Sequence, residues 1–238
     1  MGIKIVTTCH KEGWDEYGRK CLGGLKFWPQ DAKIVWYTEG FVLPPTRYAE
    51  ARPNEDLPKL QAFKQRHKHY IWPDWRYDVV RFCNKIYAVH DALYDHDGLG
   101  VWMDADIVAT RRLPKGYLET LLPDDCYIAL FQRDGMHSEC GLWLVNCRNK
   151  IHRPFMDALL DWYEKDAFVS AHEWHDSVLM DATVRAFERD GLIKSHNLSG
   201  PHKGEEHPMA KHDIAKYVDH LKGPSRKQLG RSPERVTA

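Results

Sequence analysis

Short runs of β-branched and aromatic residues alternate along the chain with segments in which apolar residues recur every three or four positions. The first pattern is typical of buried strands, and the second of helices that cover a sheet. Their alternation predicts an α/β fold, Rossmann-like, with a mostly parallel central sheet flanked by helices. The expected strands are residues 3–8, 33–38, 100–103, 126–131 and 141–146.

The longest helical pattern covers residues 76–94, where apolar residues share one face and Asp78, Arg81 and Lys85 share the polar side. Two more helices are expected around residues 155–163 and 178–187.

A chain of 238 residues fits one ordinary domain. Residues 41–58 are rich in proline and lack periodic apolar positions, so we expect a loop there. We place the domain at residues 1–222. Residues 223–238 are expected to be a partly flexible basic tail with little structure of its own.

Composition narrows the classes of function. The 34 basic residues balance 34 acidic ones, so no net field draws the chain to nucleic acid or to an anionic membrane. No apolar run approaches the roughly 20 residues that span a bilayer, and the amino terminus resembles a strand more than a signal peptide. The six scattered cysteines favour reduced thiols. We therefore expect a soluble, cytoplasmic protein without integral membrane association.

The segment most informative about function is Val101-Trp-Met-Asp104-Ala-Asp106, where an apolar strand ends in two carboxylates. Open α/β sheets place ligands at such strand ends. Two like charges there repel and lose hydration, so their joint presence is best explained by a cation that they share with a substrate phosphate. Oxygen ligands suit Mg²⁺ or Mn²⁺. The alternative is that both aspartates only cap a turn.

Four other segments stand in order around this pair. They are a strand ending in Thr7 and Thr8, a helix with Arg81 and Lys85, residues 139–146, and residues 174–177. In this order and spacing the chain resembles the nucleotide-sugar glycosyltransferases of the GT-A fold, in which a strand ends in a DxD motif and a metal bridges the donor diphosphate.

The resemblance implies that Thr7, Thr8 and Cys9 hold the donor nucleoside, because the family's first strand-to-helix loop has that role. Tyr17 is then a stacking partner for the base, although a plain helix aromatic explains it equally well.

The diphosphate contacts implied by the resemblance come from Asp104 and Ala105 of the motif and from Arg81 and Lys85. Two cations four residues apart on one helix repel, and a facing diphosphate would turn that repulsion into attraction. Exposure to solvent is the alternative for each cation.

The segment His220-Leu-Lys-Gly223-Pro-Ser-Arg226 is similar to the His-x-x-Gly-x-x-Lys motif of the glycogenin-like retaining branch. In that branch the histidine completes the metal site, which implies Asp104, Asp106 and His220 as ligands. Gly223 and Arg226 would contact the donor, with arginine in place of the usual lysine. The Pro-Trp pair that usually follows is absent.

Two carboxylates are implied for the transfer itself. Asp176 occupies the place of an acidic residue near the anomeric carbon or the acceptor hydroxyl, and it would otherwise be the N-cap of a helix beginning at Ser177. Glu139 precedes the acceptor-side strand. If the resemblance at His220 holds, the sugar keeps its configuration and Asp176 or Glu139 steadies the oxocarbenium-like centre. Otherwise Asp176 is the general base of an inverting transfer.

The expected activity is therefore metal-assisted transfer from a nucleotide diphosphate sugar, a UDP-sugar by expectation, to a hydroxyl acceptor. Glycosylation of a hydroxymethylated DNA base is one alternative, because nine tryptophans and the basic segments 64–68 and 226–231 would supply stacking and phosphate contacts. A metal-dependent phosphatase or nucleotidyltransferase, or an inactive sugar or nucleic-acid binding module, are others. His67 and His69 have no thiols and no regular ligand spacing around them, so we expect them on the solvated surface and not at a metal.

Overall fold

A computed structural model of the chain describes residues 2–70, 73–199 and 207–235. Its strands are β1 (Gly2–His10), β2 (Lys33–Glu39), β3 (Glu50–Pro53), β4 (Gly98–Met103), β5 (Ile107–Ala109), β6 (Ile128–Arg133), β7 (Met136–Asn146), β8 (Ser195–Asn197) and β9 (Val218–His220). Seven of them form one sheet in the order β3-β2-β1-β4-β7-β6-β8. Strand β7 pairs antiparallel with β4 and β6, and the other pairs in this sheet are parallel.

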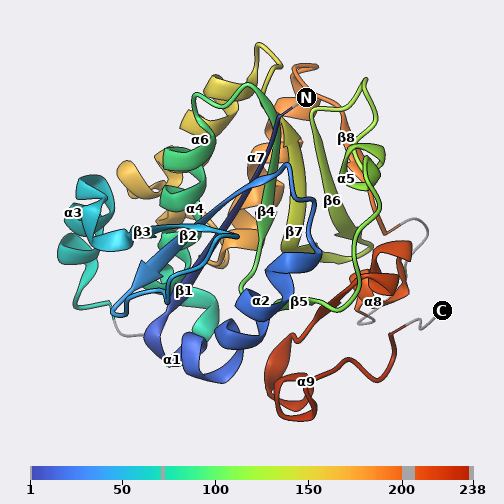
Figure 1. Ribbon diagram of the computed structural model, residues 1–238. Helices are drawn as coiled ribbons and strands as arrows, with labels where there is room; N and C mark the ends of the chain where they lie inside the picture. The colour runs from blue at the N-terminus through green and yellow to red at the C-terminus, as the bar shows by residue number, and fades with distance from the viewer. Residues whose placement is uncertain (1, 71–72, 200–206, 236–238) are drawn as a thin grey trace.

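Helices lie on both faces of this sheet (Figure 1). They are α1 (Lys11–Gly13), α2 (Arg19–Gly24), α3 (Pro58–His67), α4 (Val79–Leu93), α5 (Tyr117–Thr120), α6 (His152–Glu164), α7 (Asp176–Arg189), α8 (Pro208–Lys211) and α9 (Gly223–Leu229), with a π-helical turn η1 (Trp14–Gly18) between α1 and α2. The expectation of an α/β domain with a mostly parallel, helix-flanked sheet is confirmed.

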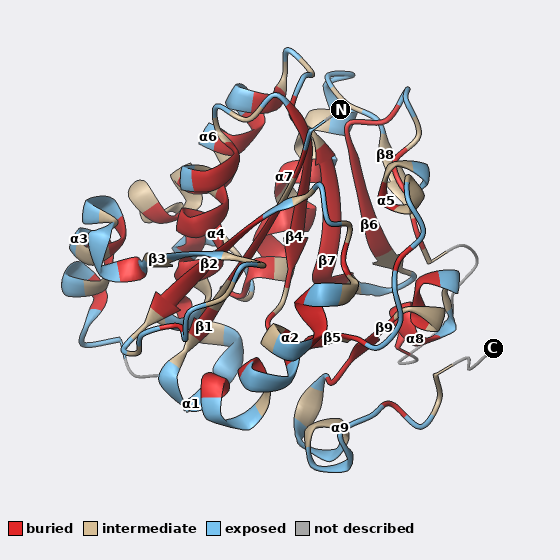
Figure 2. Ribbon diagram, viewed as in Figure 1, coloured by how far each residue is buried: buried red, intermediate tan, exposed pale blue. Residues whose placement is uncertain are grey.

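Side-chain alternation along the central strands creates two apolar cores, one on each face of the sheet. Trp102 of β4 packs with α3, α4, α6 and α7 on one face. Its neighbours Val101 and Met103 pack with α2, α5 and α8 on the other. Strand β4 is buried along its whole length (Figure 2), so the residue that follows Met103 emerges from the middle of the molecule. A strand buried on both faces explains the continuous apolar run in the sequence.

All five expected strands occur, and their ends differ from expectation. Strand β7 begins at Met136, five residues before the expected start, because its first part forms a hairpin with β6 in which Phe131 pairs with Glu139. The first residues of β7 are mostly polar, so they do not form the apolar run by which a buried strand is predicted.

The expectation of a loop over residues 41–58 is wrong for its second half. Strand β3 pairs parallel with β2 at the edge of the sheet, and a helical turn follows it at Asn54–Asp56. An edge strand tolerates Pro53, because one side of its backbone needs no ladder partner. Proline content therefore did not exclude a strand here.

The expected helix over residues 76–94 is two elements. A 3₁₀ turn at Trp75–Tyr77 precedes α4, and Asp78 between them has non-helical dihedral angles (φ −79°, ψ 70°). Its carboxylate accepts a hydrogen bond from the backbone N–H of Arg81 at 3.1 Å, as an N-cap does. Within α4, Lys85 is buried and does not belong to the solvated side that the pattern predicted.

The carboxyl-terminal segment is more ordered than expected. Strand β9 pairs with β5 in a separate two-stranded sheet, and residues 223–229 form α9. Beyond the helix, Ser232 donates its backbone N–H to Asp219 Oδ2 at 2.9 Å and its hydroxyl to the His220 carbonyl at 3.1 Å. The expectation of little structure is therefore wrong here, while residues 236–238 lie outside the described residues.

The six cysteines are free and buried, in agreement with reduced thiols. Among the described helices, none has both the length and the apolar character that crossing a bilayer demands.

Candidate active site

Asp104 leaves the carboxyl end of β4 in a fixed orientation. Its backbone N–H donates to the Gly141 carbonyl of β7 at 2.7 Å, which extends the pairing of the two strands by one residue. Trp102 then donates its indole N–H to Asp104 Oδ1 at 2.7 Å. The carboxylate is therefore held at the carboxyl end of β4 by contacts that an isolated turn does not supply.

The two-stranded sheet brings His220 to the aspartate pair. Ile107 of β5 pairs directly with His220 of β9, so the histidine lies beside the residue that precedes Ile107. His220 Nε2 is 3.0 Å from Asp106 Oδ1, and one donor atom from each of Asp104, Asp106 and His220 lies within 4.8 Å of the others. His220 is 3% exposed, so bulk water cannot supply partners for the nitrogen atoms of its ring.

These three residues fit a divalent cation. Asp106 Oδ1 and His220 Nδ1 are buried without a well-aligned hydrogen bond among the described residues. Burial raises the pKa of Asp104, and the neighbouring charge of Asp106 adds to this against the opposing charge of Lys85. Burial acts to raise the pKa of Asp106 as well, but the charges of His220 and Lys227 outweigh it and hold that pKa below its usual value. Two carboxylates and an imidazole brought together in this way are a candidate donor set for a divalent cation.

Gly141 provides the space that His220 occupies. A Cβ at this position would overlap the imidazole ring and lie 2.9 Å from Nδ1 and 3.1 Å from Glu139 Oε1. The ring and the strand backbone therefore approach as closely as a glycine allows.

We expect Gly141→Ala to displace His220 and lower Mn²⁺ affinity by about 10- to 100-fold, the loss typical of disturbed metal surroundings. Overpacking should also destabilise the fold by about 1–3 kcal/mol. Calorimetric titration with Mn²⁺ and thermal unfolding measure the two effects. Gly23→Ala is the matched control, because a Cβ there meets nothing within 4 Å. Unchanged Mn²⁺ affinity in Gly141→Ala would remove His220 from the ligand set.

Lys85 connects Asp104 to Asp176. Its Nζ lies 3.0 Å from Asp104 Oδ1, donates a short hydrogen bond to Asp176 Oδ2, and donates to the Cys140 carbonyl at 2.9 Å. Burial alone would lower the pKa of Lys85, but the two carboxylates raise it well above its usual value, so the group is an ammonium. The helix α7 begins at Asp176 itself with His175 as N-cap, so the alternative of an Asp176 N-cap is wrong.

Glu139 lies beside His220 and contacts Lys222 and the backbone of Gly141. Its carboxylate pairs with Lys222, accepts the Gly141 backbone N–H at 3.1 Å, and has Oε1 3.8 Å from His220 Nδ1. Burial would raise the pKa of Glu139, but Lys222 and His220 hold it far below its usual value. His207 packs edge-on against the His220 ring, with centroids 4.9 Å apart. Lys222 and His207 follow no motif, and the sequence did not single them out.

The cation nearest to the aspartates from α9 is Lys227. Its Nζ lies 3.7 Å from Asp106 Oδ2 and 4.2 Å from the centre of the Tyr17 ring. Arg226, the residue at the motif's lysine position, pairs instead with Glu234. Gly223 begins the helix with a left-handed φ of 81°, a conformation that favours glycine. The cation near the aspartates thus stands one residue after the motif's lysine position, which is where the sequence pointed.

The expected nucleoside residues lie at the carboxyl end of β1. Thr7 is fully buried and its hydroxyl has no hydrogen bond among the described residues, while the Thr8 hydroxyl accepts from Asn54 at 3.3 Å. Burial raises the pKa of the Cys9 thiol to about 12, so it is neutral. Because β1 and β4 are parallel neighbours, these residues and Asp104 lie on the same side of the sheet, at the carboxyl ends of the two strands.

Arg81 and Ala105 differ in their surroundings. Arg81 is exposed on the first turn of α4, and its guanidinium lies 5.8 Å from the centre of the Phe82 ring. Ala105 is buried between the two aspartates. The cation of α4 that contacts the aspartate site in the structure is Lys85, four residues after Arg81.

Two cations of the basic segment 64–68 are paired with acids of the same chain. Lys64 pairs with Glu39, and Arg66 pairs with Asp166 at 3.0 Å. His67 is buried with Nε2 2.7 Å from Asp166 Oδ1, so its expected place on the solvated surface is wrong. The positive charges of Lys64 and Arg66, which a nucleic-acid surface would need, are therefore compensated by acidic residues of the same chain.

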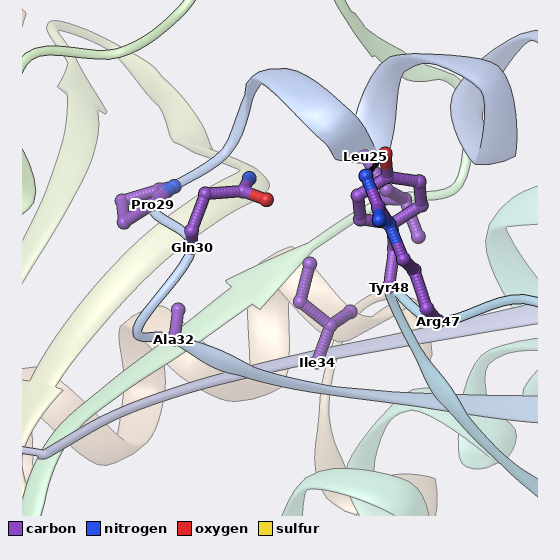
Figure 3. Close-up of a pocket in the computed structure, with 7 residues that line it drawn as sticks. All are labelled: Leu25, Pro29, Gln30, Ala32, Ile34, Arg47 and Tyr48. Carbon is purple, nitrogen blue, oxygen red and sulfur yellow. Dashed lines mark hydrogen bonds between the residues drawn. The ribbon is translucent and has the colours of Figure 1, made fainter.

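A pocket beside β2 contains none of the carboxylates or histidines described above (Figure 3). It is lined by Leu25, Pro29, Gln30, Ala32, Ile34, Arg47 and Tyr48.

No known family and no curated protein matches the sequence. Among solved structures, mouse xyloside xylosyltransferase 1 superposes with a TM-score of 0.52 at 11% identity, over 84% of this chain and 86% of that one. The bifunctional glycosyltransferase WbbM superposes at 0.51 and 10% identity, over 83% of this chain and 39% of that one. The chain has the GT-A fold.

A third match, the glycosyltransferase GlyE of Streptococcus pneumoniae, has a TM-score of 0.48 at 12% identity and covers 82% of this chain. The chain spans less than half of the length of GlyE and of WbbM, 45% and 39%. At identities this low the superpositions show a shared fold only, because one fold supports many activities.

Proposed function

We propose that this chain is a metal-dependent glycosyltransferase that moves a sugar from a nucleotide diphosphate donor, a UDP-sugar by preference, to a hydroxyl acceptor. The observation that supports the proposal most is the meeting of Asp104, Asp106 and His220, residues from distant parts of the chain, at the carboxyl end of β4. The six buried free thiols suit a reducing compartment, so we place the activity in the cytoplasm.

Asp104, Asp106 and His220 would hold Mn²⁺ or Mg²⁺, and the buried Ala105 between the two aspartates would belong to the donor-binding part of the site. Such an ion supplies Lewis-acid stabilisation of the departing diphosphate. His220 is oriented by Glu139 and Gly141, the kind of outer contact that fixes a ligating imidazole.

Two ammonium groups flank the aspartate site and would bind the diphosphate. Lys85 lies on the Asp104 side and Lys227 on the Asp106 side. Each is held by carboxylates, and a phosphate would take over part of that pairing. Arg81, Arg226 and Gly223 then belong to the outer part of the donor site.

The nucleoside would lie along Thr7, Thr8 and Cys9, where the buried Thr7 hydroxyl has an unused hydrogen-bonding capacity. The Tyr17 ring, now under Lys227, would stack on the base once the lysine turns to phosphate.

Asp176 is the better placed of the two candidate carboxylates for the transfer step. Lys85 joins it to Asp104, whereas Glu139 is enclosed by Lys222 and His220. If His220 binds the metal as in the retaining branch, Asp176 steadies the oxocarbenium-like centre and the sugar keeps its configuration. In an inverting transfer Asp176 instead takes the proton of the acceptor hydroxyl.

The test is incubation of the protein with a panel of nucleotide diphosphate sugars, with nucleotide diphosphate release and sugar transfer both followed. We expect activity with one donor class in Mn²⁺ or Mg²⁺, its loss in EDTA, and its return when either ion is added in excess, as oxygen-rich coordination is labile. Full turnover in chelated protein would contradict metal dependence, and no donor hydrolysis or transfer with any member of the panel would contradict the function.

Lys227→Ala should weaken donor binding in Mn²⁺ by about 10- to 100-fold, the value of one charge-assisted contact. Arg226→Ala is the matched control, since its guanidinium already pairs with Glu234, and we expect a smaller loss. Deletion from His220 onward removes the histidine and both cations and should weaken binding most. Calorimetry with the nucleotide sugar measures all three. A larger loss in Arg226→Ala than in Lys227→Ala would restore the assignment made from the sequence motif.

A further inference from the structure

A second group of metal-binding side chains lies outside the aspartate site. His137 comes from the start of β7, and Glu173 and His175 come from the loop before α7. One donor atom from each lies within 4.8 Å of the other two. His172, from the same loop, adds a third imidazole beside His137.

Neighbouring donor atoms in this group are separated by distances close to those between two ligands of one ion. His175 Nε2 is 2.9 Å from Glu173 Oε2, His137 Nε2 is 3.8 Å from the same oxygen, and His172 Nε2 is 3.3 Å from His137 Nε2. Ligands about 2.0–2.1 Å from a tetrahedral Zn²⁺ are about 3.3 Å apart, which lies inside this range. Small side-chain rotations would equalise the three distances.

These donor atoms face one another, while Asp181 Oδ2 lies 3.8 Å from Nδ1, the other ring nitrogen of His137. Arg76 binds Glu173 through Oε1 at 3.2 Å, so Oε2 alone faces the imidazoles. The loop is fixed as well, because the Trp174 backbone N–H donates to the Arg76 carbonyl at 2.8 Å. His175 is buried while His172 is exposed, so the group is closed on its inner side and open on its outer side. A fixed loop with one open side allows an ion to enter without unfolding.

We propose that His137, Glu173 and His175, with His172 as the fourth ligand, bind a structural Zn²⁺. Three imidazoles and one carboxylate make four donors of types that zinc binds, and four is the number of ligands it takes in tetrahedral sites. Mg²⁺ and Mn²⁺ prefer oxygen, so the two sites of this chain select different ions. The chain therefore holds a zinc site on the loop and a labile Mn²⁺ or Mg²⁺ site on the aspartates.

Zinc at this position would tie the start of β7 to the loop that leads into α7. That loop ends at His175, next to Asp176 in the chain. The ion would fix the amino end of α7 and with it the carboxylate that Lys85 holds. Its binding can be measured without sugar transfer, so the proposal does not depend on the proposed activity.

The test separates the two sites by substitution. Protein carrying both Asp104→Asn and Asp106→Asn is stripped with chelator, given Zn²⁺, and freed of excess ion by gel filtration. Metal analysis is expected to find one zinc per chain, as for a site with four protein ligands. Adding His137→Gln to this protein should remove the zinc, with affinity lowered at least about 100-fold. His90→Gln is the matched control, because His90 also faces a carboxylate, Asp157 at 3.3 Å, outside this group.

His172→Gln provides a variant whose folding is not in question, since the side chain is exposed. It should weaken zinc binding while circular dichroism stays unchanged. Replacement of zinc by Co²⁺ should give the strong visible absorption of a tetrahedral site, and His175→Gln should abolish it. The proposal is overturned if the protein lacking both aspartates retains no zinc, or if His137→Gln and His172→Gln retain as much as their parent.

Discussion

Asp104→Asn and Asp106→Asn are each expected to lower kcat for sugar transfer by at least about 1,000-fold, because metal stabilisation of transition-state charge is worth several kcal/mol. The amide keeps the size of the side chain and the oxygen that accepts the Trp102 indole N–H, so Asp104→Asn removes charge without removing that contact. The fold should therefore survive. Single-turnover kinetics with saturating donor and Mn²⁺ measure the chemical step directly.

Asp97→Asn is the matched control, since Asp97 is largely exposed and pairs with Arg148 on the surface. It should leave kcat unchanged. Thermal unfolding of all three variants separates loss of metal from loss of fold. If both active-site variants keep full turnover, the metal site is wrong, and the aspartates are reduced to the turn residues that their sequence position also allows.

The sequence predicted the central features of this fold for a definite reason. Strands buried on both faces have continuous apolar runs, and a pair of carboxylates directly after such a run is visible without any structure. Strand β4 with Asp104 and Asp106 is such a case. Elements stabilised mainly by one edge contact, such as β3 and β5, have no comparable pattern and were missed.

The site was less predictable than the fold because its geometry depends on contacts between distant segments. A family motif pointed to His220, and the pairing of β9 with β5 places it beside Asp106. The same motif pointed to Arg226, but helical geometry turns Lys227 toward the aspartates. Helix α4 gave a similar error, since periodicity cannot distinguish a solvated lysine from one that is buried between carboxylates, as Lys85 is.

Lys85→Met is expected to destabilise the fold by about 3–5 kcal/mol, the cost of leaving buried charge without its partner. The lysine side chain is 10% exposed and compensates Asp104 and Asp176 together. Methionine fills a similar volume, so the loss would come from charge and not from a cavity. Denaturant unfolding of the metal-free protein measures it. Lys194→Met is the control, because Lys194 pairs with Asp125 on the surface and should have no measurable effect.

The second half of this prediction concerns the partner. Asp176→Asn in the Lys85→Met background should recover part of the lost stability, because one of the two uncompensated carboxylates is then neutral, and the coupling in the double-mutant cycle should be about 0.5–3 kcal/mol. Mn²⁺ should stabilise Lys85→Met as well, since a cation on Asp104 replaces the missing ammonium beside it. Donor affinity should remain low even then, because the ammonium proposed to bind the diphosphate is absent. If Lys85→Met unfolds at the same denaturant concentration as the parent protein, Lys85 is not the ion that holds Asp104 and Asp176 together, and the charge balance argued for this site is wrong.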